Sequence, residues 1–340
     1  MNVLLVGNYL STPKHNLNVW QDLAFHLEKV GFEVATTSSK TNKVARLIDM
    51  LLNIWLLRRN YQAAQVDVFS GQAFLWAECC GKLLHALGKP FILTLHGGNL
   101  PAFSQKHSPK VKQILGMANV VTAPSNYLLH QMAQYRPDIL LIPNPIEISN
   151  YSFRVRISPT PSLIWLRAFH RVYNPVMAPK VLSHLFPAFP ETRLTMIGPD
   201  KGDHTLQATI ECAQALGVTH MMSLPGSVSK SEVPGVLNKN DIFINTTNSD
   251  NAPTSLIEAM ACGLCVVSTN VGGIPYLINH NVDGILVPPD DPMAMANAIQ
   301  RILSEPGLAE KLSLNGRKKA EQLDWSIVLP QWEKLFNGLV

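Results

Sequence analysis

Short runs of β-branched and other apolar residues alternate with helical patterns along the whole chain. The first half holds six such runs: NVLLVGNY, FEVATTSS, VDVFSG, PFILTLHGG, NVVTAPS and DILLIPNPI. Between the first two, one helical face is marked by Leu17, Trp20, Leu23, Leu27 and Val30. Gly31 follows, and glycine is the usual residue just past a helix end. Strand–helix–strand alternation predicts a parallel sheet with helices on both faces.

The pattern stops at residues 150–161, where YSFRVRISPTP is polar, contains proline and has no period, which is typical of a linker. Five strand-like runs then follow: SLIWLRAF, LTMIGPD, DIFINTT, LCVVSTN and GILVPP. Helical patterns lie among them at Pro175–Leu185, Thr205–Leu216, Lys230–Leu237, Pro253–Cys262 and Pro292–Leu303. We therefore expect an α/β chain of two Rossmann-like domains, residues 1–155 and 156–324, with residues 325–340 packing back on the first. Ligands bind at the carboxyl ends of parallel strands, so two such edges facing each other would form a deep cleft.

The composition agrees with a globular, two-domain chain. Of 340 residues, 46% are hydrophobic and 15% are charged, which is enough apolar material to form two cores. The N-terminal MNVLLVGNYLSTPKHN lacks the basic start of a signal peptide, and its apolar run ends at Gly7, so it is expected to be a strand. No segment reaches the ~18 uninterrupted apolar residues of a membrane span.

The five cysteines do not form a pattern typical of a metal site. Cys79 and Cys80 are adjacent within a helical pattern, and Cys262 and Cys265 form one C-x-x-C between a helix and a strand. A single pair without neighbouring histidines is weak evidence for zinc. We expect structural, reduced cysteines in a cytoplasmic protein.

The charge is unevenly distributed. Residues 1–160 hold 15 Lys and Arg against 8 Asp and Glu, a net +7, whereas residues 161–340 hold 13 against 16, a net −3. A basic first half is compatible with an anionic membrane, an anionic acceptor or nucleic acid, and equally with an ordinary solvated surface. We expect no nucleic-acid partner, and a peripheral contact with the inner face of the membrane is the open alternative.

Two common phosphate-binding chemistries do not fit. A dinucleotide oxidoreductase needs G-x-G-x-x-G after a strand, but GNYLSTPKH follows the first strand and SLIWLRAF is followed by no glycine. The G-x-x-x-x-G-K-[ST] loop is also absent. No carboxylate cluster suited to Mg²⁺ is present either, so neither a metal nor a cofactor is expected.

The segment SDNAPTSLIEAMACGLC carries the strongest functional signal. Pro253 suits the first position of a helix, and Thr254 and Ser255 follow in the first turn, whose free amides can hold a phosphate. Glu258 lies one turn further on the same face and could accept hydrogen bonds from a ribose. Asp250, before the helix, could accept from sugar hydroxyls. These positions predict a nucleoside diphosphate with an attached sugar, although a dipole-capping acid and an ordinary helix Glu would look the same.

The same segment resembles the donor-site signature of family 4 retaining glycosyltransferases of the GT-B fold, here as Asp250-x7-Glu258. The continuation EAMACGLCVVSTNVGGIPYLI and DGILVPPDDP is similar to the family as well. So are IWLRAF, LTMIGPD, TLHGGNLP, VTAPSNYL and LIPNPI, in the expected order. The resemblance covers nearly the whole chain and is most specific in its C-terminal part.

The resemblance implies a role for each site residue. Glu258 would hold the donor ribose, Asp250 the transferred sugar and Arg167 the donor diphosphate. His96 would lie near the sugar and the reacting carbon. The remaining donor-binding set is Gly97, Gly98, Asn251, Thr254 and Ser255. The nucleotide sugar is a co-substrate, and the leaving phosphate would take the acceptor proton on the same face of the sugar, without a metal.

Three positions depart from the family pattern. The first strand–helix loop has no glycine between Gly7 and Gly31, although Lys14 and His15 could supply charge. Asn174 and Pro175 stand where a lysine is usual, so Arg171 or Lys180 would have to replace it. Pro253 replaces a common glycine and removes one amide donor. The missing glycines favour the alternative, a non-catalytic GT-B subunit that binds a glycan or protein; a nucleotide-sugar epimerase is a third reading.

One further segment, KVARLIDMLLNIWLLRR at residues 43–59, combines an apolar helical face with flanking basic residues. The expected face is made of Val44, Leu47, Ile48, Leu51, Ile54 and Trp55. It is too short and too charged to span a bilayer but could lie at an interface. The competing interpretation is a helix that simply covers the first sheet.

Overall fold

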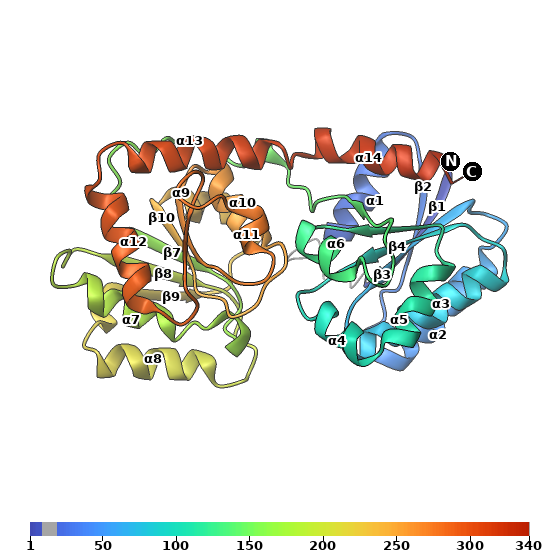
Figure 1. Cartoon of the computed structure of the whole chain (residues 1–340), viewed down its shortest axis with the longest axis horizontal. Coiled ribbons are helices and arrows are strands. Elements are labelled where there is room, and N and C mark those ends of the chain that lie inside the picture. The colour runs from blue at the N-terminus through green and yellow to red at the C-terminus, as the bar shows by residue number, and fades with distance from the viewer. Residues whose placement is uncertain (9–18, 340) are drawn as a thin grey trace. The chain divides into compact units, whose positions relative to one another are not determined.

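The computed structural model describes residues 1–8 and 19–339, which form two compact units. Unit 1 comprises the described residues of Met1–Pro145 and Trp325–Val340, and unit 2 is Ile146–Asp324. Each unit has a parallel sheet between layers of helices (Figure 1).

Unit 1 has a six-stranded sheet in the order β2-β1-β3-β4-β5-β6, with every pair parallel. Its strands are β1 (Asn2–Val6), β2 (Glu33–Thr37), β3 (Ala63–Val68), β4 (Phe91–Leu95), β5 (Val120–Ala123) and β6 (Leu140–Leu141). Its helices are α1 (Val19–Lys29), α2 (Lys43–Leu56), α3 (Phe74–Ala86), α4 (Leu100–Lys106), α5 (Ser108–Met117), α6 (Asn126–Met132) and α14 (Trp325–Asn337). The six runs expected from the sequence are all strands.

Alternate residues of the unit 1 strands bury opposite faces of the sheet. On β1, Leu4 and Val6 belong to the core under α2, α3 and α5, while Val3 and Leu5 belong to the core under α1 and α14. α14 covers this second core, and its Trp325 stacks on His26 of α1 with ring centroids 4.1 Å apart. A strand buried on both faces has a nearly continuous apolar run, as this sequence has.

Unit 2 has a second six-stranded parallel sheet, in the order β12-β11-β10-β7-β8-β9. Its strands are β7 (Ser162–Leu166), β8 (Arg193–Ile197), β9 (Met222–Gly226), β10 (Ile242–Asn245), β11 (Cys265–Thr269) and β12 (Ile285–Val287). Its helices are α7 (Met177–Leu185), α8 (Thr205–Ala215), α9 (Val233–Asn238), α10 (Thr254–Ala261), α11 (Ile274–Leu277), α12 (Pro292–Ser304) and α13 (Leu308–Glu321). From β7 the chain adds β8 and β9 on one side of the sheet and then β10, β11 and β12 on the other, so the switch point lies between β7 and β10. Ligands bind at such switch points in open parallel sheets.

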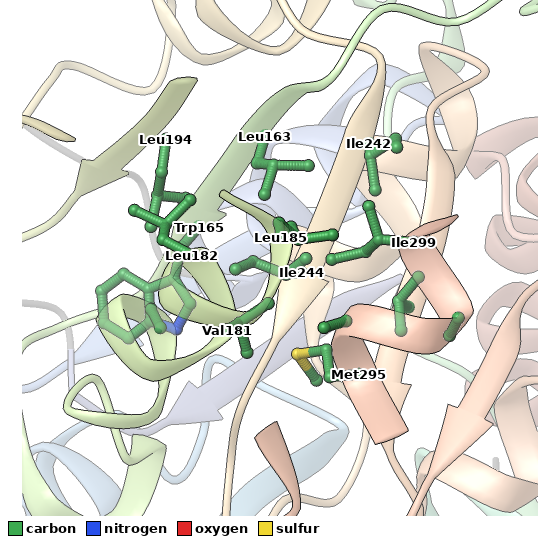
Figure 2. Close-up of a cluster of buried hydrophobic side chains, with 14 of the residues drawn as sticks. Leu163, Trp165, Val181, Leu182, Leu185, Leu194, Ile242, Ile244, Met295 and Ile299 are labelled. Atoms are coloured by element: carbon green, nitrogen blue, oxygen red, sulfur yellow. The ribbon is translucent and has the colours of Figure 1, made fainter. Parts of the chain in front are cut away.

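The unit 2 core forms by the same alternation. Leu163 and Trp165 of β7 and Ile242 and Ile244 of β10 meet side chains of α7 and α12 (Figure 2). The residue between each of these pairs points to the opposite core, which α9, α10 and α11 cover. Both strands are therefore held rigidly up to their carboxyl ends, where the candidate site residues begin.

The expected linker at 150–161 is a structured part of unit 2, so the expected boundary at residue 155 is wrong by about ten residues. Arg156 is 1% exposed, and its guanidinium donates to Asn240 O at 2.9 Å and to Cys262 O, and contacts Asp241. Thr160 donates to the same Asp241 carboxylate through its amide and its hydroxyl, each at 2.8 Å. The segment lacks a periodic pattern because hydrogen bonds and ion pairs of Arg156, Thr160 and Asp241 hold most of it.

Three elements of unit 2 were not expected, the strand β9, the short helix α11 and the helix α13. β9 alternates half-buried and exposed residues at the sheet edge and contains Pro225, so its run has a weak apolar signal. α13 buries small residues such as Ala309, Ser313 and Gly316, which do not stand out as an apolar stripe. Among the described residues, no helix is long and apolar enough to cross a membrane.

Candidate active site

Arg167 follows β7 directly and is fixed by its backbone. Its N–H donates to Ile197 O at 3.0 Å, continuing the ladder with β8. Gly198 packs so closely that a Cβ there would lie 1.7 Å from Arg167 O, so only glycine fits. The side chain is 15% exposed and its guanidinium carbon lies 4.6 Å from the Tyr173 ring centre. Burial lowers the pKa of Arg167, while the charges of Tyr173 and Glu258 act in the opposite sense.

Asp250, in the loop after β10, forms an ion pair with Arg167. One carboxylate oxygen of Asp250 also accepts from the Asn251 N–H at 2.9 Å. The structure therefore brings together two of the residues that the sequence singled out, although 83 positions separate them. The Arg167 Nε has no hydrogen-bond partner among the described residues.

The Asp250–Asn251 turn rests on a pair of glycines. Gly273 N–H donates to Asp250 O at 2.9 Å. A Cβ on Gly272, whose φ is +55°, would lie 2.1 Å from Asp250 O, and one on Gly273 would lie 1.8 Å from Asn251 O. Backbone thus packs on backbone with no room for a side chain. The link between this double glycine and the position of Asp250 is visible only in the structure.

α10 begins at Thr254, with Pro253 as the N-cap residue in an extended conformation (ψ 112°). The expected helix is confirmed, but Pro253 lies one residue before its first position. Ser255 is 8% exposed, and its hydroxyl has no hydrogen-bond partner among the residues that the structure describes. A buried hydroxyl without a partner is costly, so this one fits a site that a ligand completes. The dipole and free amides of the same helix end favour an anion.

Glu258 lies one turn into α10 and is 7% exposed. It accepts a hydrogen bond from Tyr151 Oη at 2.8 Å. Burial raises the pKa of Glu258, while the Tyr151 hydrogen bond and the charges of Lys230 and Arg167 lower it. A buried carboxylate with one neutral donor retains capacity to accept further hydrogen bonds.

One of the two cations that act on Glu258, Lys230, is not one that the sequence suggested. Arg171 and Lys180 are exposed, and the Arg171 backbone N–H donates to Asp203 at 2.9 Å. Lys230, between β9 and α9, is half-buried and interacts electrostatically with Glu258. Its position after an unpredicted strand explains why the sequence analysis passed over it.

In unit 1, His96 follows β4 and is 6% exposed. The backbone N–H of His96 donates to Val68 O at 2.8 Å, and the centre of its ring lies 4.9 Å from that of the Phe69 ring. His96 Nε2 lies 3.4 Å from Asp67 Oδ1, which also accepts from Gln65 Nε2 at 2.8 Å. The other oxygen of this buried carboxylate has no hydrogen-bond partner in residues 1–8 and 19–339.

Gln65 and Asp67 are site candidates that the sequence analysis missed. Both lie in β3, two residues apart, and therefore point to one face of the sheet. A polar residue at every second position of an otherwise apolar run is the signal that could have identified them. In the parallel register of β3 and β4, Asp67 is paired with Thr94, so these two side chains are on the same face of the sheet. His96 follows Thr94 by two residues, so its side chain is on that face as well, with those of Gln65 and Asp67.

The two glycines after His96 have different surroundings. Gly97 is exposed with φ +81°, and a Cβ there would meet no atom within 4 Å, so its conformation rather than space favours glycine. Gly98 is half-buried in the turn that leads into α4. Lys14 and His15, in the glycine-free first loop, lie outside the described residues. Among those described, no group of three His, Cys, Asp or Glu side chains could hold a metal ion.

Comparison with known proteins defines the class. Sucrose-phosphate synthase from Thermosynechococcus elongatus superposes with a TM-score of 0.81 at 17% identity, over 99% of this chain and 98% of that one. Anabaena HepE, solved in complex with UDP and glucose, superposes with a TM-score of 0.74 at 16% identity, over 98% and 99%. The fold is therefore that of the GT-B glycosyltransferases.

The sequence comparison gives the family. Residues 18–150 match the family described as Glycosyltransferase Family 4, and residues 152–319 match Glycosyl transferases group 1. The chain belongs to the family 4 glycosyltransferases. A D-inositol 3-phosphate glycosyltransferase from Thermobispora bispora is 22% identical over 322 residues, 86% of this chain and 75% of its own length. One from Thermobifida fusca is 27% identical over 115 residues, 34% of this chain. Five such relatives are matched over only 24% to 51% of their own length.

Proposed function

We propose that the chain transfers a sugar from a nucleotide-sugar donor to an acceptor, with retention of configuration and without a metal. The observation that carries the proposal is the set of buried groups at the switch point of unit 2. Arg167 Nε and Ser255 Oγ are donors without partners among the described residues, and Glu258 is a buried acceptor beside them in charge interaction with Arg167. A diphosphate would satisfy the donors, and ribose hydroxyls would satisfy the acceptor.

The proposed roles follow from charge and hydrogen-bonding capacity. Arg167 binds the diphosphate and stabilises the charge that develops on it as the leaving group. Asp250 exchanges part of its pairing with Arg167 for hydroxyls of the transferred sugar. Glu258 holds the ribose, while Asn251, Thr254 and Ser255 line the phosphate end of the site.

The proposed reaction substitutes one bond at the anomeric carbon. The bond from that carbon to the phosphate oxygen breaks, and a bond to the acceptor oxygen forms on the same face. The leaving phosphate oxygen takes the acceptor proton, so no protein base is required. For His96, with Gly97 and Gly98, we propose a role toward the sugar or acceptor, prepared by its contact with Asp67.

Nucleotide binding tests the proposal directly. UDP, GDP and ADP are added in EDTA, and at about 100 times the dissociation constant a native-state ligand adds about 2.7 kcal/mol to the unfolding free energy. We expect at least one nucleotide to raise the melting temperature, and to do so equally with Mg²⁺. UDP is the first to test, because HepE was solved with UDP-glucose. No shift with any nucleotide would contradict the donor site.

Hydrolysis of the nucleotide sugar separates the enzyme from the alternative. A non-catalytic subunit would show nucleotide binding without hydrolysis or transfer to any glycan or lipid-linked acceptor. We expect slow hydrolysis that is lost in Asp250→Ala, and the anomeric configuration of a transfer product, read by NMR, tests retention.

We also propose the cytoplasm as the compartment of the chain. All five cysteines are free, and Cys80, Cys262 and Cys265 are buried thiols, which is typical of a reducing environment. Fractionation of the native cells tests this, and recovery with secreted proteins would contradict it.

A further inference from the structure

Helix α2 is apolar on both of its sides, which an ordinary covering helix is not. Its inner side does cover the unit 1 sheet: Met50 and Ile54 are buried, and Tyr61 Oη donates to Ile54 O at 3.0 Å. α3 packs beside it (Figure 1). The expected covering role is therefore real, and Ile54 does not belong to an outward face as the sequence suggested.

The outer side of α2 exposes five large apolar residues. Their exposed fractions are 68% for Val44, 52% for Ile48, 52% for Leu52, 49% for Trp55 and 60% for Leu56. Val44, Ile48, Leu52 and Leu56 follow one another at intervals of four residues, and Trp55 lies three residues after Leu52, so all five share one stripe of the helix. We call these five residues the outer face of α2. A soluble surface helix normally carries polar residues at such positions, so this face is suited to a partner.

Basic residues stand at both ends of this face. Lys40 and Lys43 precede or begin the helix, and Arg58 and Arg59 follow it. Arg58 places its guanidinium carbon 4.1 Å from the Trp55 ring centre and donates to Trp55 O at 2.7 Å. The only acid in residues 40–59 is Asp49, which is half-buried. Within residues 40–59, the exposed charges at both ends of the apolar face are therefore of one sign.

We propose that the outer face of α2 docks onto an anionic lipid surface. A helix of 14 residues is about 21 Å long, too short for a hydrocarbon core of about 30 Å, so it would lie in the interface. Its apolar stripe enters the headgroup boundary, Trp55 lies at the interface, and the four cations meet lipid phosphates. Each basic residue near an anionic leaflet strengthens binding by about five-fold.

The charge pattern also argues against a second copy of the chain as the occupant. Pairing two outer faces in antiparallel fashion would bring Lys43 of one copy against Arg58 and Arg59 of the other, and parallel pairing would place like ends together. Either arrangement juxtaposes like charges at the rim of a desolvated patch. A negatively charged lipid surface complements every cation of the face at once.

Vesicle co-sedimentation of the full chain tests the proposal. Vesicles of phosphatidylcholine alone and with 30% phosphatidylglycerol are compared at low and high salt. We expect binding to the anionic vesicles only, weakened at least ten-fold at high salt. Ile48→Ser with Leu52→Ser, and separately Arg58→Glu with Arg59→Glu, each reduce it at least ten-fold. Trp55 fluorescence, taken as the difference from Trp55→Phe, shifts to the blue on binding.

Matched controls lie on unit 2. Leu216→Ser with Met293→Ser removes two exposed apolar side chains, and Lys311→Glu with Lys318→Glu makes the same charge change. Both controls retain vesicle binding, and every variant keeps the wild-type melting temperature within a few degrees. Absence of vesicle binding, equal loss in the controls, or a dimer abolished by the α2 variants would overturn the proposal. None of these results depends on nucleotide binding, so failure of this proposal would leave the proposed donor site unaffected.

Discussion

The buried carboxylate of Glu258 allows ligand affinity and stability to be separated by one substitution. Glu258→Gln keeps the side-chain shape and an oxygen for the Tyr151 hydroxyl, which now lies 2.8 Å from the carboxylate. Ribose hydroxyls lose a charged acceptor, and a hydrogen bond to a charged group is worth about 1.5–3 kcal/mol. Nucleotide affinity should therefore fall by about 10- to 150-fold.

The same substitution should stabilise the protein without ligand. Burial raises the pKa of Glu258 above its ordinary value of 4.5, so the folded state holds this proton more tightly than the unfolded state. The stability that Glu258 contributes is present below pH 4.5 and is lost as pH rises through the raised pKa. A glutamine side chain cannot ionise, so the Glu258→Gln variant does not lose this stability as the pH rises. Its melting temperature should therefore exceed that of wild type at pH 8, and the difference in melting temperature should narrow toward pH 4.5. A gain of about 1 kcal/mol would raise it by about 2–4 °C.

Calorimetry from pH 4.5 to pH 8 without ligand, combined with titration calorimetry with UDP, measures both effects. Glu191→Gln is the control, because Glu191 is exposed and this substitution removes the same charge. It should change neither quantity. A Glu258→Gln variant that is less stable than wild type at pH 8, or that binds nucleotide as wild type does, would refute the reasoning.

Three other outcomes are expected. Asp250→Asn lowers kcat about 100-fold while nucleotide affinity, measured by calorimetry, stays within a few-fold, since its contacts strengthen in the transition state; equal losses in both would contradict this. Gly272→Ala abolishes nucleotide binding and lowers the melting temperature more than Gly202→Ala, whose φ is also positive (+73°) but whose Cβ would meet no atom within 4 Å; equal effects would mean that backbone strain alone matters. Asp67→Asn lowers kcat without changing nucleotide affinity, because it acts through His96; an unchanged kcat would remove it from the site.

The alternation of apolar runs predicted the fold well because its cause is local. A parallel strand that is buried on both faces must be apolar at nearly every position, and this is visible in a single sequence. Leu163, Ile164 and Trp165 show it, since all three are fully buried although they face different cores. Edge strand β9 and helix α13 lack that constraint, so their sequences carried little signal.

Part of the candidate site was also predictable, because α10 presents Thr254, Ser255 and Glu258 at helical spacing. The residues that contact the site side chains were not predictable from the sequence. Tyr151 lies 107 positions before Glu258, in a segment whose polar, aperiodic sequence is typical of a linker. Asp67, to which Gln65 donates, approaches His96 only because β3 and β4 are adjacent in the sheet. Contacts of this kind depend on strand order, which a single chain without its structure does not reveal.

The glycines show how far apart the parts of one binding feature can be. Asp250 can meet Arg167 only if the loop after β10 is held in place, and Gly272 and Gly273, which follow β11, hold it by backbone contact. Gly198, after β8, does the same for Arg167 from the other side. In a parallel sheet, loops after neighbouring strands emerge at one edge, so a glycine in one loop sets the position of an ionic residue in the next. These close backbone contacts therefore decide whether Asp250 and Arg167 can meet at all.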